Sequence, residues 1–150
     1  MLFLTFQLGS DRYAVEAAQV VEVLPLVTVK RTPRAPAGVA GILNYHGRPV
    51  PLIDLVELAL GKPSRKWMST RIILVDYIGE SGKVHLLGLL AEQVTETMRC
   101  AEGDFAVSGV AMTDAPYLGS VATNAAGIVQ RIKVKNLVPE NVRSQLFCES

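Results

Sequence analysis

Two histidines and two cysteines are the first side chains of this 150-residue sequence to consider for catalysis. A hydrolytic triad needs a histidine beside a nucleophile and an orienting carboxylate. His85 stands between Val84 and Leu86 in an apolar run, which favours a structural histidine over a catalyst. His46 precedes Gly47 at an expected turn, which favours surface contact over chemistry. Neither histidine indicates a triad.

Metal and phosphate sites find equally little support. Cys100 and Cys148 lie far apart and match no metal-ligand spacing, so we interpret them as thiols of a reducing compartment. The glycine-rich run 79–83 lacks the spacing of a phosphate-binding loop and is typical of a hairpin turn. The sequence therefore predicts a protein that is not an enzyme and holds no metal or cofactor.

Asp54 has a local explanation in the start of a helix. It precedes the run Leu55 to Leu60, and Glu57 follows three residues later, which is the pattern of a capping box. Gly61 then fits the end of that helix. This pattern favours an N-cap over a catalytic acid or a phosphorylation site.

Basic side chains alternate near the carboxyl end of the sequence. Arg131, Lys133 and Lys135 occupy every second position of an expected strand over 127–135, which puts them on one face. A solvated strand face and a patch for an acidic partner both fit this pattern. The formal net charge of +1 and the lack of interleaved aromatic residues argue against nucleic acid.

The overall composition predicts one folded unit over residues 1–150. Hydrophobic residues make up 49% of the chain, which excludes intrinsic disorder. No run approaches the ~18 consecutive apolar residues of a membrane span, and the opening residues lack the positive segment of a signal peptide. We therefore expect a cytoplasmic protein.

Short β-branched runs separated by turn residues position these side chains. About eight to ten strands at short, regular spacing favour small barrels or a sandwich, and no crossover helix for a parallel sheet is present. We expect short helices near residues 36–40, 55–60 and 139–147. The expected strands include 2–8, 20–24, 41–47, 48–54, 70–78, 84–91, 94–99, 117–123 and 127–135.

The segment from Gly41 to Asp54 predicts a hairpin that turns at His46 and Gly47. Its prolines, Pro49 and Pro51, remove backbone donors from one side of the second strand. That strand should therefore lie at a sheet edge or a bulge.

The same segment carries a family resemblance. The run 41–55, GILNYHGRPVPLIDL, resembles the CheW-like domain signature, approximately G-x-x-N-x-R-G-x-x-x-P followed by two hydrophobic residues and D-L. The run 20–23 resembles the family's V-x-E-I segment, and the run 87–94 resembles its glycine-containing strand. The resemblance extends from residue 3 to about residue 138. Six positions of the signature fall in register: Gly41, Asn44, Gly47, Pro51, Asp54 and Leu55.

This resemblance implies an all-β fold of two small five-stranded SH3-like barrels that share a hydrophobic seam. It implies one domain of two intertwined lobes, with a short carboxyl-terminal helix near 139–147. CheW-like proteins bind the regulatory domain of the chemotaxis histidine kinase CheA and the cytoplasmic tip of chemoreceptors, without catalysis or cofactor. The length leaves no room for a kinase or receiver domain, so we expect a stand-alone adaptor at membrane-associated receptor clusters.

The resemblance also implies the residues that bind partners. The sequence departs from the family where His46 replaces the usual arginine, with Arg48 one place after the glycine, and where Ala91 and Glu92 replace V-D. The basic triplet near residue 133 is a further departure. These departures suit a divergent coupling protein of a parallel chemosensory system, such as surface sensing or pilus control. The expected partner-binding residues are Val20, Glu22, Asn44, His46, Gly47 and Arg48.

A second interpretation remains open. The chain could be a small β-barrel domain that binds a ligand or performs catalysis in the groove between the barrels, with His46 and Arg48 as its polar groups.

Overall fold

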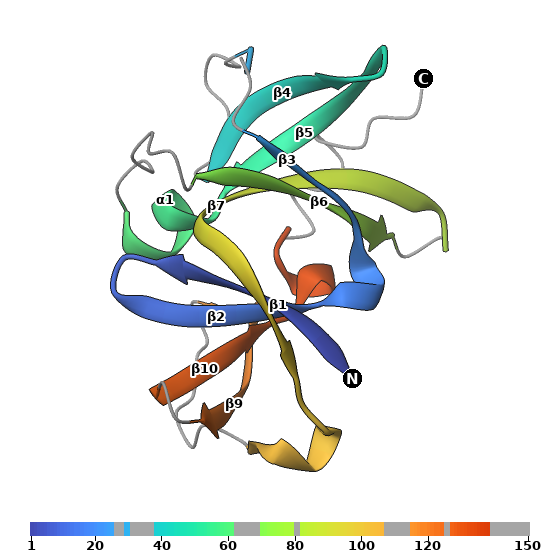
Figure 1. The fold of residues 1–150 in the computed structure, drawn as a ribbon. Helices are drawn as coiled ribbons and strands as arrows, with labels where there is room; N and C mark the ends of the chain where they lie inside the picture. Colours follow the sequence, from blue (N-terminus) through green and yellow to red (C-terminus); the bar gives the residue numbers. More distant parts are fainter. Residues whose placement is uncertain are drawn as a thin grey trace.

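A computed structural model describes residues 1–25, 29–30, 38–61, 70–79, 82–106, 115–124 and 127–138. The described part holds ten strands, one short α-helix and three 3₁₀ turns (Figure 1). This composition confirms the all-β prediction. In chain order the elements are β1 Leu2–Leu8, β2 Asp11–Glu16, η1 Ala17–Gln19, β3 Val20–Pro25, β4 Val39–Tyr45, β5 Arg48–Asp54, α1 Leu55–Leu60, β6 Arg71–Ile78, β7 Val84–Arg99, η2 Glu102–Asp104, β8 Phe105–Ala106, β9 Leu118–Asn124, β10 Gly127–Ile132 and η3 Val134–Asn136.

The strands form two lobes. One of them, which we call lobe B, contains β3, β4, β5, β6 and the first half of β7. The strands follow the order β3-β6-β7-β5-β4, and β5 runs parallel to β7. Beyond β3, Lys30 and Ile42 exchange backbone hydrogen bonds of 2.9 and 2.8 Å. That exchange joins the segment after β3 to β4 and closes the barrel.

The second lobe, lobe A, contains the second half of β7 and the strands β1, β2, β8, β9 and β10. Its order is β7-β1-β2-β10-β9-β8, with β10 parallel to β2. β7 is a single strand of 16 residues that passes from lobe B into lobe A. The prediction of two separate strands over this stretch was wrong. Gln93, with a positive φ of 51°, lies near the crossing, where the pairing with β1 is irregular.

Three apolar clusters fill the two lobes and the seam between them. The seam cluster draws side chains from both lobes, so burial of apolar area holds the lobes together. One smaller cluster fills lobe B and another fills lobe A. The members that represent each cluster are Phe6, Val15, Leu89 and Ile132 in the seam, Leu43, Leu52 and Leu74 in lobe B, and Phe3, Ala14 and Val129 in lobe A.

The helix α1 begins as the sequence predicts. The Asp54 side chain accepts hydrogen bonds from the backbone N–H groups of Val56 and Glu57, at 3.0 and 3.2 Å. The helix ends at Gly61, whose φ of 76° is left-handed. In a complete capping box the Glu57 side chain would accept a hydrogen bond from the backbone N–H of Asp54. That N–H donates instead to the carbonyl oxygen of Gly38 at 2.8 Å, so this half of the prediction was wrong.

The helix predicted near residues 36–40 was also wrong over its second half. Gly38 lies in a turn, and Val39 and Ala40 already belong to β4. The pairing of Val39 with Ile53 and of Gly41 with Leu52 on β5 explains why the chain is extended there. The helix predicted over 139–147 lies outside the described residues. A further strand, β8, lies outside the strands that the sequence analysis named.

Candidate functional site

The predicted partner-binding residues all lie in lobe B, on two neighbouring segments. Val20 and Glu22 belong to β3. The other four belong to the end of β4, the turn and the start of β5. Glu22, His46 and Arg48 are exposed, whereas Val20 is half-buried and packs against the seam. Together β3 and the β4–β5 turn form the candidate site.

The β4–β5 turn has the geometry that its sequence predicts. His46 and Gly47 have positive φ angles of 51° and 82°, as a tight two-residue hairpin turn of type I′ requires. The Gly47 N–H donates to the side-chain oxygen of Asn44 at 2.7 Å. Asn44 and Gly47 therefore shape the turn, and His46 and Arg48 are the charged or titratable groups that it presents to solvent.

Tyr45 belongs to the site although the sequence did not indicate it. Its hydroxyl donates a hydrogen bond of 2.6 Å to Oε2 of Glu22, and this hydrogen bond raises the pKa of Tyr45 above its ordinary value. The ring of His46 meets the ring of Tyr45 edge-on, with centroids 4.5 Å apart. Tyr45 stands inside the run that carries the resemblance, but no local pattern links it to Glu22.

Exposed apolar side chains flank Glu22 on β3. The pairing of β3 with β6 shifts register between Val20 and Glu22, which places an extra residue, Val21, on β3. Val21 and Val23 are 46% and 39% exposed, respectively. Because Val20 faces the seam, Val21 and Val23 are the valines of β3 that a partner could contact.

The basic triplet does not form the strand face that alternation predicted. β10 ends at Ile132, and Lys135 lies in the 3₁₀ turn that follows. The physical reason is burial, since Ile132, Val134, Leu137 and Val138 all enter the seam, which a straight strand could not achieve. Lys133 and Lys135 are exposed, whereas Arg131 is not.

Arg131 points into lobe A. Its guanidinium forms an ion pair with Glu16, and its carbon Cζ lies 5.5 Å from the ring centroid of Phe3 and 5.9 Å from that of Phe105. Cation–π contacts of this kind add to the ion pair. Arg131 therefore links strands of lobe A and does not share an exposed strand face with Lys133 and Lys135.

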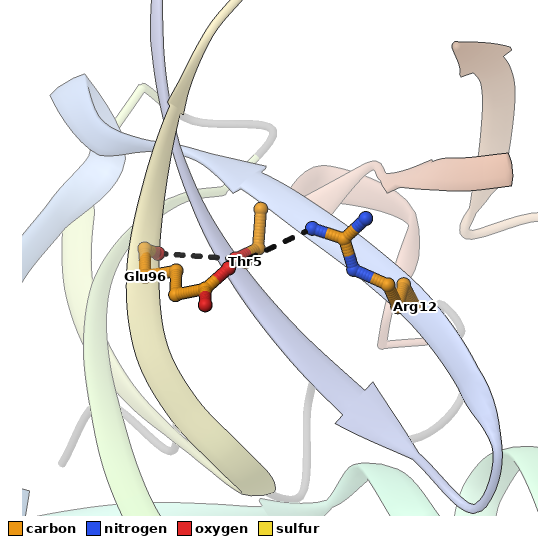
Figure 2. A network of polar contacts seen from close by, with 3 residues as sticks. All are labelled: Thr5, Arg12 and Glu96. Atoms are coloured by element: carbon orange, nitrogen blue, oxygen red, sulfur yellow. Dashed lines mark hydrogen bonds and ion pairs between the residues drawn. The ribbon is translucent and has the colours of Figure 1, made fainter. Parts of the chain in front are cut away.

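A second polar network also ties strands of lobe A together. Figure 2 shows Thr5 of β1 and Arg12 of β2 beside Glu96 of β7. The hydroxyl of Thr5 donates to the carbonyl oxygen of Glu96 at 3.1 Å, and the Arg12 guanidinium lies 3.9 Å from the Glu96 carboxylate. This network lies in lobe A, apart from the candidate site.

Within the described ranges, no three side chains of the His, Cys, Asp and Glu types gather into a potential metal site. His85 is half-buried on β7 opposite Tyr77, and Cys100 packs against the core of lobe A.

Apolar side chains fill the seam, and Figure 1 shows the β4–β5 turn at the end of lobe B away from lobe A. His46 and Arg48 therefore do not line a groove between the lobes. Among the described residues, no helix is long and apolar enough to cross a membrane.

Two SH3-like barrels with a shared strand and a shared apolar seam define the class of this fold. The sequence model of the CheW-like domain family matches residues 2–141, and the chain belongs to that family. A solved structure, that of the scaffolding protein TtCheW from Thermoanaerobacter tengcongensis, has a TM-score of 0.82 and 25% identity. Its alignment covers 94% of this chain and 89% of TtCheW.

Curated relatives agree with this assignment. The chemotaxis protein CheW of Helicobacter pylori is 27% identical over 103 residues, which cover 68% of this chain and 59% of the relative. The protein FrzA of Myxococcus xanthus is 26% identical over 102 residues, which cover 68% of this chain and 61% of FrzA. The chain thus spans about three fifths of the length of these relatives.

Proposed function

We propose that this chain is a non-catalytic coupling adaptor that joins chemoreceptors to a CheA-like histidine kinase. Support comes from the family, whose model matches nearly the whole chain, and from relatives named as chemotaxis and scaffolding proteins. The adaptor would bind the kinase regulatory domain and the receptor's cytoplasmic tip, and it would work in the cytoplasm at receptor clusters.

The single observation that carries the site is the joint surface of β3 and the β4–β5 turn. Glu22, His46 and Arg48 are exposed there, beside the exposed Val21 and Val23. Exposed apolar side chains next to charged groups are the usual composition of a protein-binding surface. The hydrogen bond between Tyr45 and Glu22 makes the two segments one surface.

Charge reversal at this surface tests the proposal. Glu22→Lys and Arg48→Glu should both stay folded. Reversing the exposed charge of Arg48 changes stability by no more than about 0.5 kcal/mol. Glu22→Lys also loses the hydrogen bond from Tyr45, which costs about 1 kcal/mol more. Each should weaken binding to the kinase or the receptor, by about 2–5 kcal/mol where the charge meets a buried partner. Titration calorimetry with both partners, beside circular dichroism melts, measures the two effects.

Arg99→Glu is the matched control, since Arg99 is an exposed arginine of lobe A at the far end of β7. It should leave both affinities unchanged. Wild-type affinity for both partners in both test variants would refute the proposed surface and direct attention to the exposed Lys133 and Lys135. A chain that binds neither kinase nor receptor would refute the adaptor function itself.

A further inference from the structure

The hydroxyl of Tyr45 connects two segments that do not pair with each other through their backbones. β3 pairs with β6 and β4 pairs with β5, and the bridge between Lys30 and Ile42 lies beyond the end of β3. The hydrogen bond of 2.6 Å from Tyr45 to Glu22 spans 23 positions of sequence. One phenolic hydroxyl therefore fixes the β4–β5 turn to β3.

The two ends of this hydrogen bond differ in burial. The Tyr45 ring is half-buried, packs against the apolar cluster of lobe B and contacts the ring of His46. Glu22 is exposed, between the exposed Val21 and Val23. A long exposed side chain keeps much of its rotamer freedom, whereas a packed ring with two torsion angles does not. The fixed hydroxyl thus selects one orientation of the Glu22 carboxylate.

A carboxylate that accepts one phenolic hydrogen bond keeps its negative charge and most of its acceptor positions. Hydrogen bonds from a guanidinium or ammonium group to a carboxylate are short and about twice as strong as neutral ones. A pre-oriented carboxylate loses less conformational entropy when such a bond forms. Glu22 is thus prepared to receive a cationic side chain.

We infer that Tyr45 is a positioning residue, which holds Glu22 so that its carboxylate receives a lysine or arginine side chain of the partner protein. This inference rests on the proposed function, because it assigns a chemistry to the same surface. Tyr45 acts through Glu22 alone, so removing its hydroxyl does not change the affinity for the partner once the Glu22 carboxylate is absent.

The coupling between Tyr45 and Glu22 is tested first in the protein without partner. Carbon-13 labelling of the tyrosine rings allows each to be titrated by NMR, and Tyr45→Phe identifies the signal of Tyr45. The apparent pKa of Tyr45 should fall toward the ordinary value in Glu22→Gln, because the acceptor charge that raises it is gone. An unchanged Tyr45 titration in Glu22→Gln would overturn the inference.

A double-mutant cycle then tests the effect on binding. Titration calorimetry with the kinase and the receptor compares the wild type, Tyr45→Phe, Glu22→Gln and the double variant. Tyr45→Phe should weaken binding about fivefold to tenfold, which lies within the usual net effect of losing one hydrogen bond. Glu22→Gln should weaken it at least as much, and the double variant should match Glu22→Gln, since interacting residues are not additive.

Tyr117→Phe is the matched control, because it also removes a tyrosine hydroxyl but in a buried ring of the seam. It should leave affinity unchanged. Additive losses, or wild-type affinity in Tyr45→Phe, would overturn the inference and leave the proposed function intact. A wild type that binds neither partner would overturn both.

Discussion

Removing the helix cap at Asp54 should destabilise the fold without touching the candidate site. Asp54 is 4% exposed, and its Oδ1 accepts from two backbone N–H groups at the start of α1. Loss of an N-cap costs about 0.5–2 kcal/mol, and a buried donor left without an acceptor costs about 1–3 kcal/mol. Because this cap is buried, we expect Asp54→Ala to lower the free energy of unfolding by about 2 kcal/mol.

For a chain of this size, about 2 kcal/mol corresponds to a fall in Tm of about 4–8 °C. Urea denaturation and circular dichroism melts measure the change, and binding should persist where the variant is folded. Asp54→Asn is the control, since its side-chain oxygen still accepts, and it should lose no more than about 0.5 kcal/mol. Equal losses in the two variants, or a loss below about 0.5 kcal/mol in Asp54→Ala, would refute the capping argument.

Two further predictions concern packing and pH. A Cβ at Gly88 would lie 3.0 Å from Leu52 and 3.1 Å from Leu43, so Gly88→Ala should cost about 1–3 kcal/mol in urea denaturation. Gly103→Ala, with no atom within 4 Å of the added carbon, should cost far less; equal costs would contradict the packing argument. Burial raises the pKa of Tyr117. In the unfolded chain tyrosine has a pKa of about 10. The folded state therefore favours the neutral hydroxyl of Tyr117, and the stability that depends on this neutral form is complete below about pH 10 and is lost as pH rises through the higher folded pKa. The free energy of unfolding should therefore fall less steeply above about pH 10 in Tyr117→Phe than in the wild type. Equal slopes in the two proteins would contradict this effect of Tyr117 burial.

Signals that act over a few residues were readable from the sequence. The turn at His46 and Gly47 follows from glycine's tolerance of positive φ, and the structure confirms it. The prolines of β5 predicted an edge, and β5 indeed pairs with β7 only from Leu52 onward. The cap at Asp54 followed from spacing alone.

Interactions between distant segments could not be read in the same way. Alternation sets the basic residues apart from Ile132 and Val134, which are buried, but it could not reveal that the chain turns after Ile132 to bury Leu137. The sequence could not place the Arg131 side chain either, because its partners Glu16 and Phe3 lie more than a hundred residues earlier.

The sequence by itself determined the strand composition, the central hairpin, the capped helix and the family, because these depend on local conformation and on residue spacing. Tertiary structure alone decided that β7 serves both lobes, that Val20 faces the seam while Val21 and Val23 face solvent, and that Tyr45 fixes Glu22. The physical reason is that a side-chain hydrogen bond or a register shift depends on which strands become neighbours. That choice is made by burial of the shared apolar seam, to which both lobes contribute.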